Sequence, residues 1–120
     1  MYCKVYIDSL SEKGELLDLI ANIISGFVKM RTVSTPEFQV DLVMNEDFDE
    51  TKRMQGDVQF IFYRYYLDIE PAEHAQRERY VASVGSLLNE LWKLGYKAVA
   101  ACDFEDELPE CGGYKSSFTE

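Results

Sequence analysis

Residues 58–69 read Val-Gln-Phe-Ile-Phe-Tyr-Arg-Tyr-Tyr-Leu-Asp-Ile, and this stretch decides the fold. Aromatic and β-branched residues favour strands, and here they occupy both alternating sets of positions. We expect a strand whose outward residues are Phe60, Phe62, Arg64 and Tyr66. The alternative set carries no charge and suits the covered side better: Ile61, Tyr63, Tyr65, Leu67 and Ile69. Pro71 predicts the end of this strand.

Three further strands and two helices are predicted around this stretch. Alternation and a small apolar run predict strands at residues 2–8, 38–44 and 96–104. Apolar residues at helical spacing predict a helix at residues 9–26 and a second one that begins at about Glu73 or Ala75 and ends at Leu94. Residues 27–35 fit a short strand and a packed connection equally well. Gly85, in the middle of the second helix, indicates close packing at that point.

The order of these elements predicts an α+β fold. Strand, helix, strand, strand, helix, strand (βαββαβ) describes a ferredoxin-like sandwich, a four-stranded antiparallel sheet with both helices on one face. A chain of 120 residues suits a single domain that spans residues 1–120. The second face of the sheet is then open unless another segment covers it.

Aromatic residues gather on the predicted open face. Its expected members are Tyr2, Tyr6, Phe60, Phe62, Arg64 and Tyr66, with Lys4 among them. Either a loop or the C-terminal tail covers this platform, or it forms an interface with another protein or a second copy of the chain. RNA-recognition domains also use such faces, but residues 56–60 lack the basic residue and second glycine of the usual motif.

The net charge excludes several partners. The chain holds 22 acidic and 12 basic residues, a formal charge of −10, which repels phosphate backbones and anionic lipid. We therefore expect no nucleic-acid or membrane partner. No apolar run reaches the roughly 18 residues that cross a bilayer, and the alternating N-terminus is not a secretory leader. Three cysteines without CxxC spacing favour a reducing, cytoplasmic location.

Two acidic clusters are the candidate binding residues. One follows the last strand and contains Asp103, Glu105, Asp106 and Glu107, and the other lies before residues 58–69 and contains Glu46, Asp47 and Asp49. Solvated charge explains either cluster alone, and neither has the spacing of a known calcium loop. Together they fit a docking surface for a basic partner, with Tyr114 as an aromatic anchor.

The sequence offers little for catalysis. His74 is the only histidine and stands among glutamates near a helix start. A general base needs an orienting partner and a nearby nucleophile, and no such set is found. Histidines and cysteines at zinc spacing are also missing. We therefore expect no enzyme, no cofactor and no metal.

The whole-chain layout, together with Ala-Ala-Cys-Asp-Phe-Glu-Asp-Glu-Leu-Pro at residues 100–109, resembles a class of small proteins. These are the acidic immunity proteins of bacterial contact-dependent inhibition and polymorphic toxin systems. The resemblance implies a compact cytoplasmic protein that inactivates a cognate toxin domain by covering or plugging its active site.

Three functional hypotheses follow. The first is a non-enzymatic inhibitor that binds a basic, nuclease-like toxin through carboxylates. The second is a small-molecule-binding or regulatory domain that forms a homodimer through the aromatic sheet face. The third is a small enzyme, which would need a deep pocket holding a carboxylate with a raised pKa.

Overall fold

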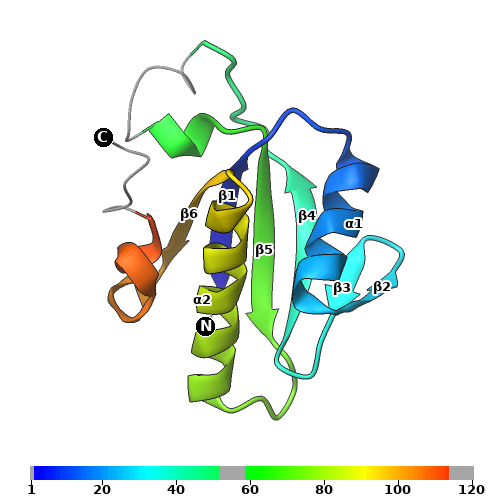
Figure 1. Cartoon of the computed structure of the whole chain (residues 1–120), viewed down its shortest axis with the longest axis vertical. Coiled ribbons are helices and arrows are strands. Elements are labelled where there is room, and N and C mark those ends of the chain that lie inside the picture. Colours follow the sequence, from blue (N-terminus) through cyan, green and yellow to red (C-terminus); the bar gives the residue numbers. More distant parts are fainter. Residues whose placement is uncertain (1, 52–58, 114–120) are drawn as a thin grey trace.

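The computed structural model of the chain describes residues 2–51 and 59–113. Figure 1 shows its α-helices on the same side of one sheet. The strands are β1 (Cys3–Asp8), β2 (Phe27–Lys29), β3 (Thr32–Ser34), β4 (Phe38–Met44), β5 (Tyr65–Pro71) and β6 (Lys97–Cys102). The helices are α1 (Lys13–Ile24) and α2 (Arg77–Lys93). There are also short 3-10 segments. η2 (Gln59–Phe62) precedes β5, and η3 (Glu105–Glu107) and η4 (Pro109–Gly113) follow β6.

The sheet has six strands, so the prediction of a four-stranded ferredoxin-like sandwich is wrong. All neighbours are antiparallel, in the order β2-β3-β4-β5-β1-β6. The two extra strands are the hairpin β2–β3, formed within the stretch that fitted either a strand or a connection. Val33 of β3 pairs with Val40 of β4, and both are fully buried. This pairing between neighbouring strands, together with the burial of both valines, fixes the hairpin as part of the sheet.

The strand expected at residues 58–69 is also corrected, because β5 begins only at Tyr65. The side chain of Asn45 donates hydrogen bonds to the carbonyls of Ile61 (2.8 Å) and Tyr63 (2.7 Å). Its backbone N–H donates to the Arg64 carbonyl at 2.8 Å. These bonds hold the segment from η2 to β5 as a turn. Val58 lies outside the described residues.

The hydrophobic core lies between the sheet and the helices. The expected alternation of β1 is confirmed, since Cys3, Val5 and Ile7 are buried. Of the set expected on the covered side, Tyr63, Tyr65, Leu67 and Ile69 are confirmed as buried. Ile61 was expected there too, but it lies in η2 and is exposed. From the helices, the core receives Leu16, Ile20, Tyr80, Val81, Val84, Leu87, Leu88 and Leu91.

Two glycines allow close approach between elements. A Cβ at Gly85 would lie 3.1 Å from Pro109 Cδ, which confirms the close packing expected in the middle of α2. A Cβ at Gly26 would lie 2.4 Å from Val33 Cγ1, so glycine there lets the chain pass directly against β3. The left-handed residue at the end of α1 is Ser25 (φ 53°) rather than the glycine. Among the described residues, no helix is long and apolar enough to cross a membrane.

Candidate functional site

The side of the sheet opposite the helices carries carboxylates on three strands. We call three of these carboxylates the acidic face: Asp41 on β4, and Asp68 and Glu70 on β5. Asp8 of β1, the cross-strand partner of Lys97, lies on the same side. Asp41 alternates with buried Val40, and Asp68 with buried Leu67. Successive side chains of a strand point to opposite faces, so the carboxylates point away from the core. Asp41 and Glu70 are exposed, and Asp68 is half-buried.

The strand register places like charges together on the acidic face. Asp41 and Asp68 are direct partners across β4 and β5, and Lys4 of β1 is the partner of Asp68 on the other side. Thr32 Oγ1 donates a hydrogen bond of 2.5 Å to Asp41 Oδ1. The Lys4 ammonium lies 4.8 Å from the centroid of the Tyr66 ring. Within residues 2–51 and 59–113, no lysine or arginine forms an ion pair with the acidic face.

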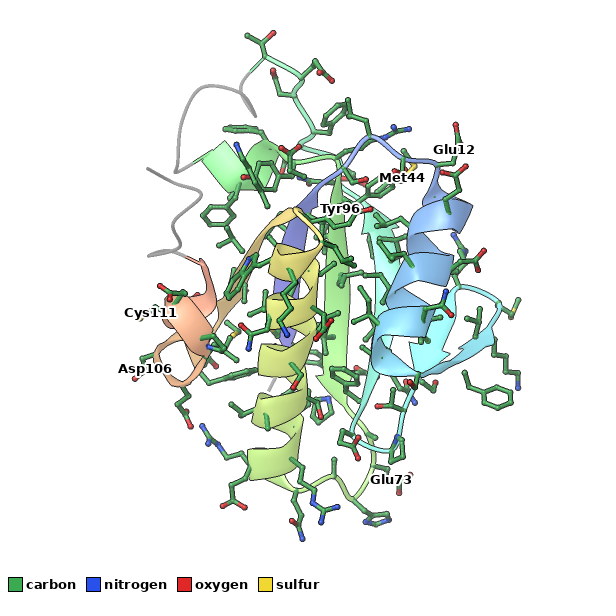
Figure 2. The ribbon with its side chains drawn as sticks, in the orientation of Figure 1. Glu12, Met44, Glu73, Tyr96, Asp106 and Cys111 are labelled. Atoms are coloured by element: carbon green, nitrogen blue, oxygen red, sulfur yellow. The ribbon has the colours of Figure 1, made fainter. Side chains whose placement is uncertain are left out.

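A hollow of about 410 Å³ borders the acidic face where β5 ends, lined by Tyr2, Gln39, Glu70, Pro71 and Glu73. Tyr2 leaves 68% of its surface exposed. Figure 2 shows Glu73 at this end of the molecule. An aromatic ring beside two carboxylates is a suitable environment for a guanidinium or ammonium group, because the ring face and the carboxylates both attract a cation.

Glu107, a predicted binding residue, already has a partner within the chain. Arg77 at the start of α2 donates two hydrogen bonds to its carboxylate, one from Nη1 to Oε1 at 2.8 Å and one from Nη2 to Oε2. These hydrogen bonds hold the pKa of Glu107 below its ordinary value. Glu107 therefore attaches η3 to α2 in this structure.

Of the other members of this cluster, Glu105 forms a hydrogen bond within the chain, and Asp103 and Asp106 are exposed. Glu105 Oε2 accepts a hydrogen bond of 2.9 Å from the backbone N–H of Cys102, which fixes η3 to the end of β6. Asp103 and Asp106 are exposed, and no hydrogen bond or ion pair within the described residues involves their carboxylates. Of the four predicted carboxylates here, these two remain available to a partner.

The structure separates the two predicted acidic clusters. Glu46 and Asp47 are exposed and follow Met44, whose partner Tyr65 begins β5. Asp103 follows β6 at the opposite end, where Cys102 pairs with Cys3 and Cys3 with Ile69. Figure 2 shows Met44 and Asp106 correspondingly apart. Asp49, the third member of the Glu46 cluster, is half-buried. The two clusters do not form one surface, whereas the Asp103 cluster lies at the same end as Glu70.

The predicted aromatic platform is smaller than expected. Phe60 and Phe62 belong to η2, and Phe60 contacts the Tyr6 ring at a centroid distance of 5.4 Å. Arg64 also precedes the strand; its Nη1 donates to the Leu10 carbonyl at 3.0 Å. Tyr6 and Tyr66 are in ring contact at 5.6 Å, and both are half-buried. The molecule's own segment η2 thus packs against the rings that a homodimer would use.

Sequence reasoning missed the acidic face and Glu73, although a signal was present. Asp41, Asp68 and Glu70 each alternate with apolar residues of a strand, which is the pattern of an outward carboxylate. The prediction was based on runs of neighbouring acidic residues, and these three carboxylates stand between apolar residues instead. Tyr114, the expected aromatic anchor, lies outside the described residues.

An enzyme would need a deep pocket that holds a carboxylate with a raised pKa. The groove between α2 and η4 has a volume of about 360 Å³ and includes Glu107, whose pKa is lowered, not raised. Over the described residues, no three His, Cys, Asp or Glu side chains gather as metal ligands would. Comparison with protein-family models, curated proteins and solved structures gave no match.

Proposed function

We propose that this chain is a protein-binding module of the immunity class, which neutralises a basic, nuclease-like toxin domain without catalysis. The binding surface we propose is the acidic face, the hollow beside it and the neighbouring residues Asp103 and Asp106. The place of action is the cytoplasm, where such a toxin would act. Carboxylates facing catalytic lysines or arginines give strong charge-assisted hydrogen bonds, and an array of carboxylates can occupy a site built for phosphates.

The observation that supports this proposal is the direct pairing of Asp41 with Asp68. Like charges directly opposite each other on neighbouring strands destabilise a sheet, by an amount on the order of 0.2–1 kcal/mol. Residues that break a local rule of stability are expected mainly at functional sites. A basic partner would convert this repulsion into attraction on binding.

The hollow gives the proposed partner a point of attachment. An arginine or lysine of the toxin, placed on the Tyr2 ring between Glu70 and Glu73, would gain both a cation–π contact and a charge-assisted hydrogen bond. Such aromatic and charged anchors carry most of the energy of protein interfaces. Asp103 and Asp106 would extend the contact at the same end of the sheet.

The test is affinity capture from an extract of cells that express the protein naturally, followed by mass spectrometry. We expect the wild type to retain a basic protein that added salt releases. The double variant D41N/D68N should retain much less of it. Its own free energy of unfolding should rise by about 0.2–1 kcal/mol, because the single like-charge pair Asp41–Asp68 is removed. The matched control E15Q/D18N removes two exposed carboxylates from α1 and should leave capture unchanged.

The captured protein must also be a toxin. Expressed alone it should arrest growth, and co-expression of this chain should restore growth while D41N/D68N should not. The cluster of Glu46, Asp47 and Asp49 is tested separately. The variant E46Q/D47N should capture the same basic protein as the wild type does. The proposal fails if capture is indifferent to salt and to D41N/D68N, or if the captured protein is harmless.

A further inference from the structure

Cys3 and Cys102 are direct partners in the antiparallel pairing of β1 with β6, and both are free thiols. Directly opposed residues of antiparallel strands have Cα atoms roughly 4.5–5.5 Å apart. That separation falls inside the range of about 4.4–6.8 Å that disulfides span. The third cysteine, Cys111, lies in η4 and is also free.

The two thiols differ in access and in acidity. Cys3 is 1% exposed, whereas Cys102, the last residue of β6, is half-buried. A hydrogen bond with the Cys3 thiol and a second from the Phe104 backbone lower the pKa of Cys102, although its partial burial and the charges of Glu105 and Asp103 oppose this. The same interaction, together with burial, raises the pKa of Cys3. Cys102 is therefore the more exposed and the more acidic of the two thiols, and Cys3 lies beside it in the core.

We propose that Cys3 and Cys102 form a thiol–disulfide exchange site, which small disulfides oxidise to a cross-strand disulfide. Cys102 is the attacking thiol and Cys3 the resolving thiol. The site uses no residue of the acidic face or of the hollow, although Cys102 directly precedes Asp103 of the proposed binding surface. The exchange reaction does not depend on the toxin-binding proposal, because it needs only the two thiols and a small disulfide.

The reaction balances with a low-molecular-weight disulfide as oxidant. The Cys102 thiolate attacks one sulfur of that disulfide, whose S–S bond breaks and releases one thiolate. Cys3 then attacks the Cys102 sulfur of the mixed disulfide and loses its proton to the departing second thiolate. The first thiolate takes a proton from water, which replaces the proton lost earlier from Cys102. The protein loses two hydrogen atoms, and the small disulfide becomes two thiols.

The consequence is a covalent link between the first and last strands of the chain. A cross-link that closes so long a loop restricts the unfolded state strongly, so the oxidised protein should unfold at a higher temperature. Since Cys102 precedes Asp103, the link also fixes the start of the acidic segment.

The experiment uses the full chain carrying C111S, which retains only the proposed pair, with oxidised glutathione as the probe. Under native conditions we expect an intact mass lower by two hydrogen atoms and a linked peptide containing Cys3 and Cys102. Dithiothreitol should reverse both. In C111S/C3A the resolving thiol is gone, so a mixed disulfide with glutathione should accumulate at Cys102. In C111S/C102A the buried Cys3 should remain unmodified.

Each other outcome counts against the site. If both thiols of folded C111S stay free while a urea-unfolded sample of the same protein reacts, the pair is inert and the proposal is wrong. If C111S itself accumulates a stable mixed disulfide at Cys102, Cys3 does not resolve it. Circular dichroism of C111S before and after oxidation shows that the reaction occurs in the folded protein.

Discussion

At the scale of single residues, Met30 shows how the chain makes the turn between β2 and β3. Lys29 pairs with Thr32, so Met30 and Arg31 form a two-residue turn. Met30 has φ of 59°, in the left-handed region, and is 91% exposed. Short hairpins favour glycine, asparagine or aspartate at such a position, because other side chains are strained there.

Replacing Met30 with glycine should therefore stabilise the protein. M30G removes a left-handed Cβ penalty of about 1–2 kcal/mol and loses part of that gain to the greater freedom of glycine in the unfolded chain. We expect the free energy of unfolding to rise by about 0.5–1 kcal/mol in urea titrations. R31G changes the adjacent residue, which has no positive φ, and should lower stability instead. A lower stability of M30G than wild type would contradict the assigned turn.

The pair Arg77–Glu107 predicts a pH dependence. Because the pKa of Glu107 is lowered in the folded state, the stabilisation is fully present above the ordinary carboxyl value of 4.5 and is lost as pH falls through the lowered value. We expect E107Q and R77Q to lose less stability than wild type below pH 4.5. The measurement is thermal unfolding across an acid series. The difference in stability between the variants and wild type should be small, because both side chains are exposed. If both variants lose as much stability at acid pH as wild type does, the pair contributes nothing.

At the scale of elements, three aromatic rings join the helix layer to the sheet and to η3. Tyr80 of α2 contacts Phe38 of β4 with ring centroids 6.4 Å apart, and Phe104 with centroids 5.6 Å apart. Phe104 is 2% exposed and immediately precedes η3. This ring, more than the surface ion pair, anchors the acidic segment after β6.

The variant F104A should accordingly destabilise the whole fold. Truncating a fully buried phenylalanine costs about 3–5 kcal/mol, and urea unfolding followed by circular dichroism measures it. L94A, which shortens a residue 55% exposed at the end of α2, is the control and should stay within about 0.5 kcal/mol of wild type. If F104A lost less than about 1 kcal/mol, η3 would not depend on this ring.

At the scale of elements, the sequence predicts those helices and strands whose pattern is set by their own residues. β1 and α2 have a period that repeats over their whole length, so the sequence predicts the alternation of β1 and the presence of α2 correctly. In residues 59–64 the aromatic pattern also fits a strand, and hydrogen bonds from the distant Asn45 decide against it. The candidate site has the same limit: the position of Asp41 on an outward face is visible locally, but its pairing with Asp68 depends on strand register.

At the scale of the whole molecule, the formal charge of −10 opposes folding at neutral pH. Dissolved ions screen the repulsion between carboxylates in the folded state, because the Debye length falls to about 10 Å at 0.1 M salt. We expect the melting temperature at pH 7 to rise when sodium chloride is increased from about 10 to 150 mM. A melting temperature that falls over this range would mean that attractive ion pairs outweigh the repulsion.

The outer strand β2 has a further consequence for the molecule in concentrated solution. One side of this strand pairs with β3, and the other forms an edge of the sheet, beside the exposed side chains of Phe27 and Val28. An edge of this kind is a template on which other chains can stack into fibrils. The strand is only three residues long and contains Lys29, and both its shortness and its cation disfavour such stacking. Lys29 therefore helps to keep the protein from aggregating, a role separate from holding its fold together.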